Sequence, residues 1–238
     1  QTDGYTLLAP SNAALNAYLN NVILEFYDTL EELPATIITD FLNAHMWLGT
    51  AWPSKFSVTT NFLNERPTVN SASAANGGNI LTSKFGSNGI FYGSNKVNEA
   101  NVFSTVYSRA YLDPAYSMMT RLIDGQGRLL ITNPSMEFTL FMIPDSKLMA
   151  MGYNYNSGFG EFTFTSGTTV TRGAGPLADL RRILNLHTLP FKQRDLSGNG
   201  IGETNQGEYI RWDNNRVYSA GTIEGKYGLR VDPTQSRD

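Results

Sequence analysis

The chain of 238 residues contains no cysteine. This absence excludes disulfides, thiolate nucleophiles and metal centres with cysteine ligands. Histidine is nearly as scarce: His45 and His187 lie far apart in the sequence, and neither has a carboxylate or a second histidine at ligand spacing. We therefore expect no resident metal and no cofactor.

Charge is also scarce, at 16% of the residues against a usual share of roughly 25%. Lys and Arg number 18 and Asp and Glu 21, so the net charge is −3 and there is no basic excess of the kind that nucleic-acid binding requires. No apolar run approaches the ~18 residues of a membrane-spanning helix. No Arg-Gly-Asp tripeptide supports integrin-type adhesion. The hydrophobic share of 41% is sufficient for a buried core, and the length suits one large or two small domains.

Local patterns in the first half of the chain predict alternating strands and helices. Tyr5–Leu8 is rich in strand formers and stops before Pro10, after which Ser11 or Asn12 can cap a helix. Pro34 precedes four apolar residues at positions i, i+1, i+4 and i+5, which lie on one face of a helix. Further strands are expected at residues 56–59, 68–70, 80–82 and 90–92, with turns at 76–79 and 87–89.

The second half repeats this order. Residues 116–123 predict an amphipathic helix, and residues 138–143 predict a strand stopped by Pro144, after which Asp145 or Ser146 can cap a helix. A helix over residues 177–186 closes at His187, and strands follow at 208–212 and 216–218.

Three motifs recur in the same order, about 130 residues apart. The first is an aromatic-Thr-Leu strand that runs into Pro and a capped helix, at Tyr5–Asn12 and Phe138–Ser146. The second is a helix that ends in Leu-Asn-x-His, at His45 and at His187. The third is an Asx turn that leads into a strand, at Asn88–Tyr92 and Asn214–Tyr218. This order predicts two tandem domains, residues 1–113 and 114–238, joined near Leu112-Asp113-Pro114.

The first copy resembles the fasciclin-like domain through Ala9-Pro10-Ser11-Asn12, Leu42-Asn43-Ala44-His45 and Asn88-Gly89-Ile90-Phe91-Tyr92. The second copy departs from the family pattern: Ile143-Pro144-Asp145 replaces Ala-Pro-Thr/Ser-Asp/Asn, Asn215 stands where Gly is preferred, and the segment before the His helix is longer. The first copy lacks the helices that precede this strand in a full family member. Residues 101–119 are similar to the linker of tandem fasciclin lipoproteins on Gram-negative bacterial surfaces.

The resemblance implies an α+β fold of two fasciclin-like domains, each a twisted antiparallel β-wedge or sandwich with flanking helices. It implies a non-catalytic, extracellular adhesion or protein-interaction module, a cell-surface lipoprotein associated with an outer-membrane complex. The partner would be a protein at the cell surface, such as a transporter complex, and membrane attachment would use an anchor outside this sequence. The motif positions would be structural; they are Pro10, His45, Asn88, Gly89, Pro144 and His187.

Aromatic residues supply candidate partner contacts. Trp47 and Trp52 follow the first motif histidine, and Tyr153, Tyr155 and Phe159 stand among Gly and Asn in the second copy. Loop aromatics can anchor a protein or stack on sugars, and they can equally pack within the fold. A carbohydrate-binding or accessory role in a glycan-uptake system therefore remains an alternative. Catalysis finds no support, because no Gly-x-Ser-x-Gly nucleophile elbow is present.

One loop has partial calcium-site character. Asp195, Ser197 and Asn199 place oxygen ligands at loop positions 1, 3 and 5, and Gly200 follows at position 6. Position 12 is Gln206 and not a bidentate Glu, although Glu203 and Glu208 lie nearby in the sequence. A plain Asx/Gly turn is the favoured interpretation, with calcium as the weaker one.

Overall fold

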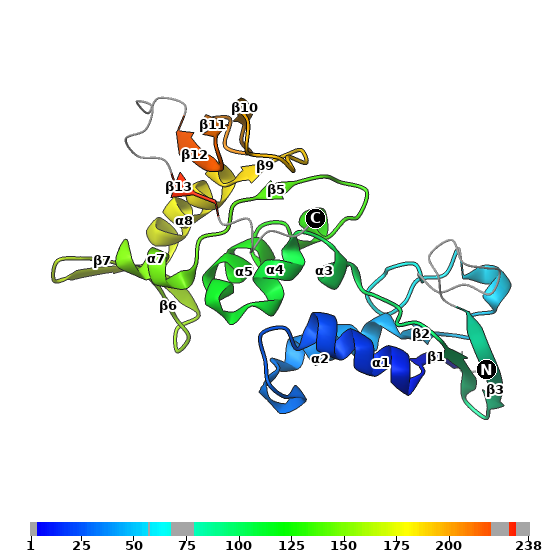
Figure 1. The fold of residues 1–238 in the computed structure, drawn as a ribbon. Helices are drawn as coiled ribbons and strands as arrows, with labels where there is room; N and C mark the ends of the chain where they lie inside the picture. The colour runs from blue at the N-terminus through cyan, green and yellow to red at the C-terminus, as the bar shows by residue number, and fades with distance from the viewer. Residues whose placement is uncertain (1–3, 57, 68–78, 220–228, 232–238) are drawn as a thin grey trace. The chain divides into compact units, whose positions relative to one another are not determined.

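The computed structural model describes residues 4–56, 58–67, 79–219 and 229–231. Its chain divides into two compact units, Gln1–Ser104 and Thr105–Asp238 (Figure 1). The predicted domain boundary at residues 113 and 114 lies further along the chain, after helix α4 (Tyr107–Leu112), and the two-domain assignment stays a prediction. In the described ranges, no helix has the length and apolar character needed to cross a membrane.

The first unit is built on one four-stranded sheet with the order β2-β1-β4-β3. Its strands are β1 (Tyr5–Pro10), β2 (Met46–Leu48), β3 (Ile80–Gly86) and β4 (Gly89–Ser94). β1 runs antiparallel to β2, and β3 and β4 form a hairpin. β1 and β4, however, are parallel along their whole length, so the prediction of an antiparallel sheet is wrong for this pairing.

Helices of the first unit start where the sequence predicts them. Ser11 caps α1, since its Oγ accepts a hydrogen bond from the Ala14 amide at 3.3 Å. α2 begins directly after Pro34, but its predicted apolar face is only partly covered: Ile37 is buried, whereas Ile38 and Leu42 are exposed. The helical segments are α1 (Asn12–Tyr18), a π-helical turn (Leu19–Ile23), α2 (Ala35–Ala44), α3 (Asn101–Ser104), and 3₁₀ turns at Leu30–Glu32 and Pro53–Lys55.

The strand predicted at residues 56–59 is not formed. Pro53 starts a 3₁₀ turn, after which the Val58 amide donates to the Lys55 carbonyl and the chain keeps turning. The Phe56 side chain belongs to the core, whereas Val58 is exposed. The strand expected at residues 68–70 and most of the turn at 76–79 lie outside the described residues.

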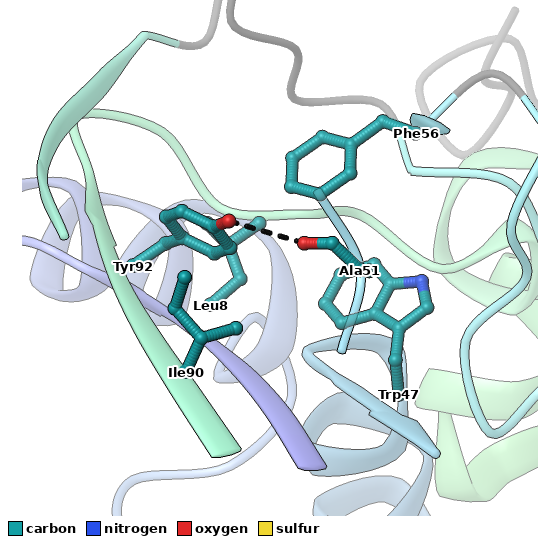
Figure 2. Packing of buried hydrophobic residues seen from close by; sticks show 6 residues of the cluster. All are labelled: Leu8, Trp47, Ala51, Phe56, Ile90 and Tyr92. Carbon is teal, nitrogen blue, oxygen red and sulfur yellow. Dashed lines mark hydrogen bonds between the residues drawn. The ribbon is translucent and has the colours of Figure 1, made fainter. Parts of the chain in front are cut away.

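The core of this unit lies against one face of the sheet (Figure 2). Its members are Leu8, Trp47, Ala51, Phe56, Ile90 and Tyr92. Trp47 stacks on Phe56 with ring centroids 6.0 Å apart, and Tyr92 meets Phe56 edge-on at 5.7 Å. The Tyr92 hydroxyl donates to the Ala51 carbonyl at 3.1 Å, so the polar end of this buried tyrosine is satisfied.

The second unit combines helices with three small sheets, whose strand orders are β6-β7-β8, β5-β9 and β10-β11-β12-β13. Besides α4, its helices are α5 (Ser117–Asp124), α6 (Arg128–Ile131), α7 (Asp145–Ala150) and α8 (Ala174–Leu186), with a 3₁₀ turn at Pro114–Tyr116. Its strands are β5 (Thr139–Leu140), β6 (Tyr153–Asn156), β7 (Glu161–Ser166), β8 (Thr169–Arg172), β9 (Thr188–Leu189), β10 (Gly200–Glu203), β11 (Tyr209–Asp213), β12 (Arg216–Ser219) and β13 (Leu229–Arg230).

Two local predictions for the second unit need correction. The strand expected over residues 138–143 contributes only Thr139 and Leu140 to a ladder. Asp145 is not the N-cap of α7 but lies inside its first turn. The Asp145 carboxylate instead accepts hydrogen bonds from the Met118 amide at 3.0 Å and the Ser117 hydroxyl at 2.6 Å, at the start of α5. This contact joins α5 to α7, and α5 also packs against α8.

Candidate interaction site

The two motif histidines have nearly identical surroundings. Each follows the last residue of a helix, His45 after α2 and His187 after α8. Their Nδ1 atoms lie 2.7 Å from the Phe41 carbonyl and 2.8 Å from the Ile183 carbonyl, one helical turn back. The Asn98 amide donates to Nε2 of His45 at 3.0 Å, so Nε2 is the acceptor and Nδ1 carries the hydrogen. Both rings thus close the last turn of a helix.

The strand that follows each histidine is joined to the preceding aromatic-Thr-Leu strand by a repeated set of hydrogen bonds. The main-chain bonds run from Leu8 N to His45 O (2.9 Å) and from Phe141 N to His187 O (2.8 Å). The threonine bonds run from Thr6 Oγ1 to Gly49 O (2.9 Å), Ala51 N to Thr6 Oγ1 (2.8 Å), Thr139 Oγ1 to Phe191 O (2.9 Å) and Gln193 N to Thr139 Oγ1 (2.8 Å). Each threonine therefore holds the chain four and six residues beyond the histidine.

The two threonines are structural residues that our sequence analysis did not single out. The signal was available, because Thr follows an aromatic residue in both copies of the first motif. Because the two threonines make equivalent hydrogen bonds in the two units, they support an internal repeat at the level of individual atoms. The third motif repeats less closely: β12 pairs with β11 and β13, whereas β4 pairs with β1 as well as β3.

Burial gives both histidines a lowered pKa, since desolvation disfavours the imidazolium form, and the hydrogen bond to the helix carbonyl opposes this only in part. A folded-state pKa below the unfolded value near 6.5 means that the unfolded chain binds more protons. The stability that the neutral rings contribute is present above pH 6.5 and is lost as the pH falls below it.

We therefore expect the free energy of unfolding to fall between pH 7.5 and pH 5.5, with a slope of at most about 1.4 kcal/mol per pH unit for each histidine. Urea denaturation at several pH values, followed by circular dichroism, measures this. His45→Gln and His187→Gln should each flatten the profile, at a cost in stability on the order of 1–3 kcal/mol for the lost buried hydrogen bonds. A stability that stayed constant over this range would contradict the structural role.

The remaining motif positions define turns and strand ends. Pro10 ends β1, and Pro144 precedes the first residue of α7. The Asn88 carbonyl accepts from the Tyr5 amide at 2.8 Å, which brings Gly89 close to the β1 main chain. Asn215, which replaces the preferred glycine, takes a left-handed φ of 58° in its turn, a conformation that Asn tolerates.

The aromatic candidates lie in different environments. Trp47 has no exposed surface and packs in the core of the first unit, where it stacks on Phe56. Trp52, by contrast, is 49% exposed and lies beside the exposed Phe85, with ring centroids 5.7 Å apart. The structure therefore separates the two tryptophans that the sequence places together.

The three candidates of the second unit belong to β6 and the turn after it. Tyr153 packs on Phe164 and Tyr155 meets Phe162, both across the β6–β7 ladder. Arg121 places its guanidinium 4.2 Å from the ring centre of Tyr155. Phe159 is 65% exposed at the tip of the hairpin, with the Arg172 guanidinium 4.9 Å from its ring centre.

The sheet of the first unit presents a second apolar surface that the sequence analysis missed. Strand residues alternate between faces: in β1 Thr6 and Leu8 are buried, whereas the large side chains of Tyr5 and Leu7 are exposed on the opposite face. We call the outward surface the sheet face; its residues are Tyr5, Leu7, Met46, Leu48 and Phe91.

Cross-strand register explains why these side chains gather. Leu7 lies opposite Met46 on one side and opposite Phe91 on the other, and Tyr5 lies opposite Leu48 and Gly89. An open hollow of about 370 Å³ lies here, and Tyr5, Leu7, Met46, Gly89 and Phe91 are among its lining residues. Its lining is predominantly apolar, which suits contact with another apolar surface.

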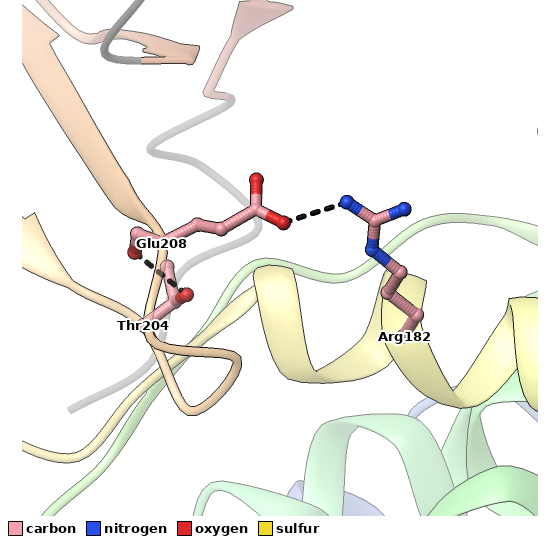
Figure 3. Close-up of polar contacts among 3 residues, drawn as sticks. All are labelled: Arg182, Thr204 and Glu208. Carbon is pink, nitrogen blue, oxygen red and sulfur yellow. Dashed lines mark hydrogen bonds and ion pairs between the residues drawn. The ribbon is translucent and has the colours of Figure 1, made fainter.

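The loop that is the calcium candidate forms a hydrogen bond within itself. The Asp195 carboxylate accepts from the Ser197 amide at 2.8 Å, which forms an Asx turn. Hydrogen bonding from the Ser197 side chain, and then from its amide, lowers the pKa of Asp195. The nearby acids have other partners: Glu203 accepts from the Tyr209 hydroxyl at 3.1 Å, and Glu208 pairs with Arg182 at 2.7 Å (Figure 3). Across the described part of the chain, no three His, Asp or Glu side chains gather as a metal site would require.

Comparisons with known proteins give a distant likeness to solved structures. No protein-family model and no curated protein sequence matches the chain. Among solved structures, it is similar to a FAS1 domain pair from the insect cell adhesion molecule Fasciclin I, with 16% sequence identity, 90% of this chain and 81% of that chain covered, and a TM-score of 0.31. A superposition this loose does not determine a family, so the fasciclin-like assignment depends on the motifs and their repeat.

Proposed function

We propose that this chain is a non-catalytic, extracellular protein-interaction module made of two fasciclin-like domains. Two observations support the fold: the three motifs recur in order, and His45, Thr6 and their bonds have atomic counterparts at His187 and Thr139. The proposed setting is a cell-surface lipoprotein beside an outer-membrane complex, held by an anchor outside this sequence.

The sheet face is the observation that carries the interaction role. Leu48 is 69% exposed at the end of the edge strand β2, opposite the exposed Tyr5, and exposed apolar clusters of this kind are typical of protein contacts. The low charge content and net charge of −3 give a weak overall field. Binding would then depend on apolar anchors and change little with salt.

Partner binding is tested by purifying the native protein from its membranes and identifying co-purifying proteins by mass. Leu48→Lys on the sheet face and Trp52→Ala beside Phe85 should each weaken the complex about tenfold, the effect of losing one well-buried anchor. Leu129→Lys is a matched control, because Leu129 is highly exposed in the other unit. A native protein that is monomeric, with no partner at low or moderate salt, would contradict the proposal.

A carbohydrate-binding role is the second candidate, and the exposed ring of Phe159 favours it. Phe159 lies at a hairpin tip with Arg172 against it, so an aromatic face and a hydrogen-bond donor lie together. Binding of cell-surface glycans to an array, lost in Phe159→Ala and retained in Leu48→Lys, would favour this candidate over the protein-interaction role.

A further inference from the structure

The two edges of the first unit's sheet differ in whether the chain itself pairs with them. β2 and β3 are the edge strands in the order β2-β1-β4-β3. Beside β2, the Phe62 amide donates to the Met46 carbonyl at 2.9 Å, so the chain occupies part of that edge itself. Beside β3, none of the residues that the structure describes bonds to the outer side of the strand. Within the described residues, β3 is therefore an edge strand of seven residues that is paired on one side.

The register of the β3–β4 hairpin determines which main-chain groups of β3 face outward. Gly86 and Gly89 are partners across a two-residue turn, and the pair that closes such a turn is hydrogen-bonded. Since alternate residues of a strand direct their N–H and C=O groups to opposite sides, Gly86 and Lys84 point toward β4. Those of Ser83 and Phe85 point away from the sheet. The outer edge thus offers the donors and acceptors with which an additional extended strand pairs.

The side chains along this edge differ between the two faces of the sheet. Phe85 lies opposite the buried Ile90, so it continues the core side of the sheet, where it is 71% exposed and close to the exposed Trp52. Lys84 lies opposite Phe91 and therefore borders the sheet face. A strand added to β3 would meet apolar rings on its core side and one ammonium group on the other.

A second copy of this chain fits the edge poorly. The two-fold antiparallel register that pairs all of residues 82–86 places Lys84 directly opposite the same lysine of the copy, and like charges at that position destabilise a sheet. A register nearer the start of β3 includes the irregularity between Ile80 and Thr82, where Leu81 is the extra residue of a bulge. A carboxylate opposite Lys84 would instead be attracted to it, so charge favours a different polypeptide with an acidic residue there.

We propose that an extended segment of a partner protein pairs with β3 and adds a further strand to the sheet of the first unit. The segment has an acidic residue opposite Lys84, and the residues before and after it are apolar and lie on the side of Phe85 and Trp52. Main-chain hydrogen bonds with Ser83 and Phe85 supply affinity, and the side chains supply selectivity. This inference rests on the proposed interaction role, and it adds the β3 edge to the sheet face as a separate contact.

The test measures binding of a fluorescein-labelled peptide, Gly-Thr-Val-Glu-Val-Thr-Gly, to the full chain by fluorescence anisotropy. This sequence reads the same in both directions, so parallel and antiparallel pairing present the same side chains to β3. Saturable binding is expected. A peptide with Lys in place of Glu should bind about fivefold more weakly. A peptide with methyl groups on the main-chain nitrogens of Val, Glu and Val keeps its side chains but loses its donors, and it should not bind.

Variants of the chain test the same contacts from the other side. Ser83→Pro removes an outward N–H group and leaves the ladder to β4 in place, because an edge strand accepts proline where its N–H faces solvent. It should weaken peptide binding about tenfold, whereas the matched control Ser83→Ala should bind as the unchanged chain does. Lys84→Glu should reverse the preference, so that the Lys peptide binds more tightly than the Glu peptide. Circular dichroism checks that each variant is folded.

The following outcomes overturn the proposal: no saturable binding, equal binding of the N-methylated peptide, or full binding by a folded Ser83→Pro variant. If Ser83→Pro does not fold, the N-methylated peptide and Lys84→Glu decide the question. A dimer in sedimentation equilibrium that Lys84→Glu or Ser83→Pro alters also overturns it, because the occupant would then be a second copy. Loss of the native complex in Leu48→Lys but not in Ser83→Pro would contradict this inference and leave the proposed function in place.

Discussion

Replacing Gly89 by alanine is expected to destabilise the first unit by about 3 kcal/mol or more, from steric overlap and backbone strain together. A Cβ at this position would lie 1.9 Å from the Tyr5 carbonyl oxygen and 2.7 Å from the Tyr5 nitrogen. Both contacts are with backbone atoms, so no flexible side chain can move away. The variant must therefore separate β1 from β4 at the start of their parallel pairing. Urea denaturation followed by circular dichroism measures the loss.

Gly49 provides the matched control for this experiment. It has a φ of +86°, but a Cβ there would meet nothing within 4 Å. Gly49→Ala should therefore cost only the left-handed backbone strain, about 1 kcal/mol. Equal losses at the two glycines would show that conformation, and not the close approach of β1 and β4, makes Gly89 necessary.

Much of the local structure could be predicted from the sequence, because short-range rules apply to it. The strand at Tyr5, the cap at Ser11 and the helix after Pro34 depend on residues within a few positions of one another. The histidine motif was also found from sequence, since the Leu-Asn-x-His pattern at His45 repeats at His187.

Long-range pairing could not be predicted in the same way. The parallel register of β1 with β4 joins segments more than eighty residues apart, and no local pattern encodes it. Asp145 has the composition of an N-cap, yet its carboxylate serves the start of α5, which lies far back in the sequence. Residues 56–59 were predicted to form a strand because they include strand formers, but Phe56 packs in the core without belonging to a strand.

The candidate contact residues needed the structure for the same reason. Trp47 and Trp52 are neighbours in sequence and both follow the motif histidine, so composition cannot distinguish them. Strand β2 turns Trp47 inward, where it stacks on Phe56, and the chain leaves the sheet before Trp52. The exposed Leu7 and Leu48 look like core residues in the sequence, and only the register assigns them to the outer face.

Trp47→Ala is expected to cost about 3–5 kcal/mol, the usual range for removing a large buried aromatic side chain. Trp47 has no exposed surface and lies at the centre of the first unit's core (Figure 2). Its indole nitrogen is buried and has no hydrogen-bond partner among the residues that the structure describes, so Trp47→Phe removes volume but breaks no polar contact seen there. Trp47→Phe should therefore cost much less, about 1–2 kcal/mol.

Trp52→Ala completes the comparison, because Trp52 is half exposed and its removal should change stability by roughly 1 kcal/mol or less. Urea denaturation and partner binding are measured for Trp47→Ala, Trp47→Phe and Trp52→Ala. Together the two measurements distinguish a role in core packing from a role in partner contact. Trp47→Ala should lose binding only in proportion to the unfolded fraction, whereas Trp52→Ala should lose binding while the first unit stays folded. If Trp47→Phe kept full stability and abolished binding, Trp47 would be a partner contact that becomes exposed in the complex, and the core assignment would hold only for the isolated chain.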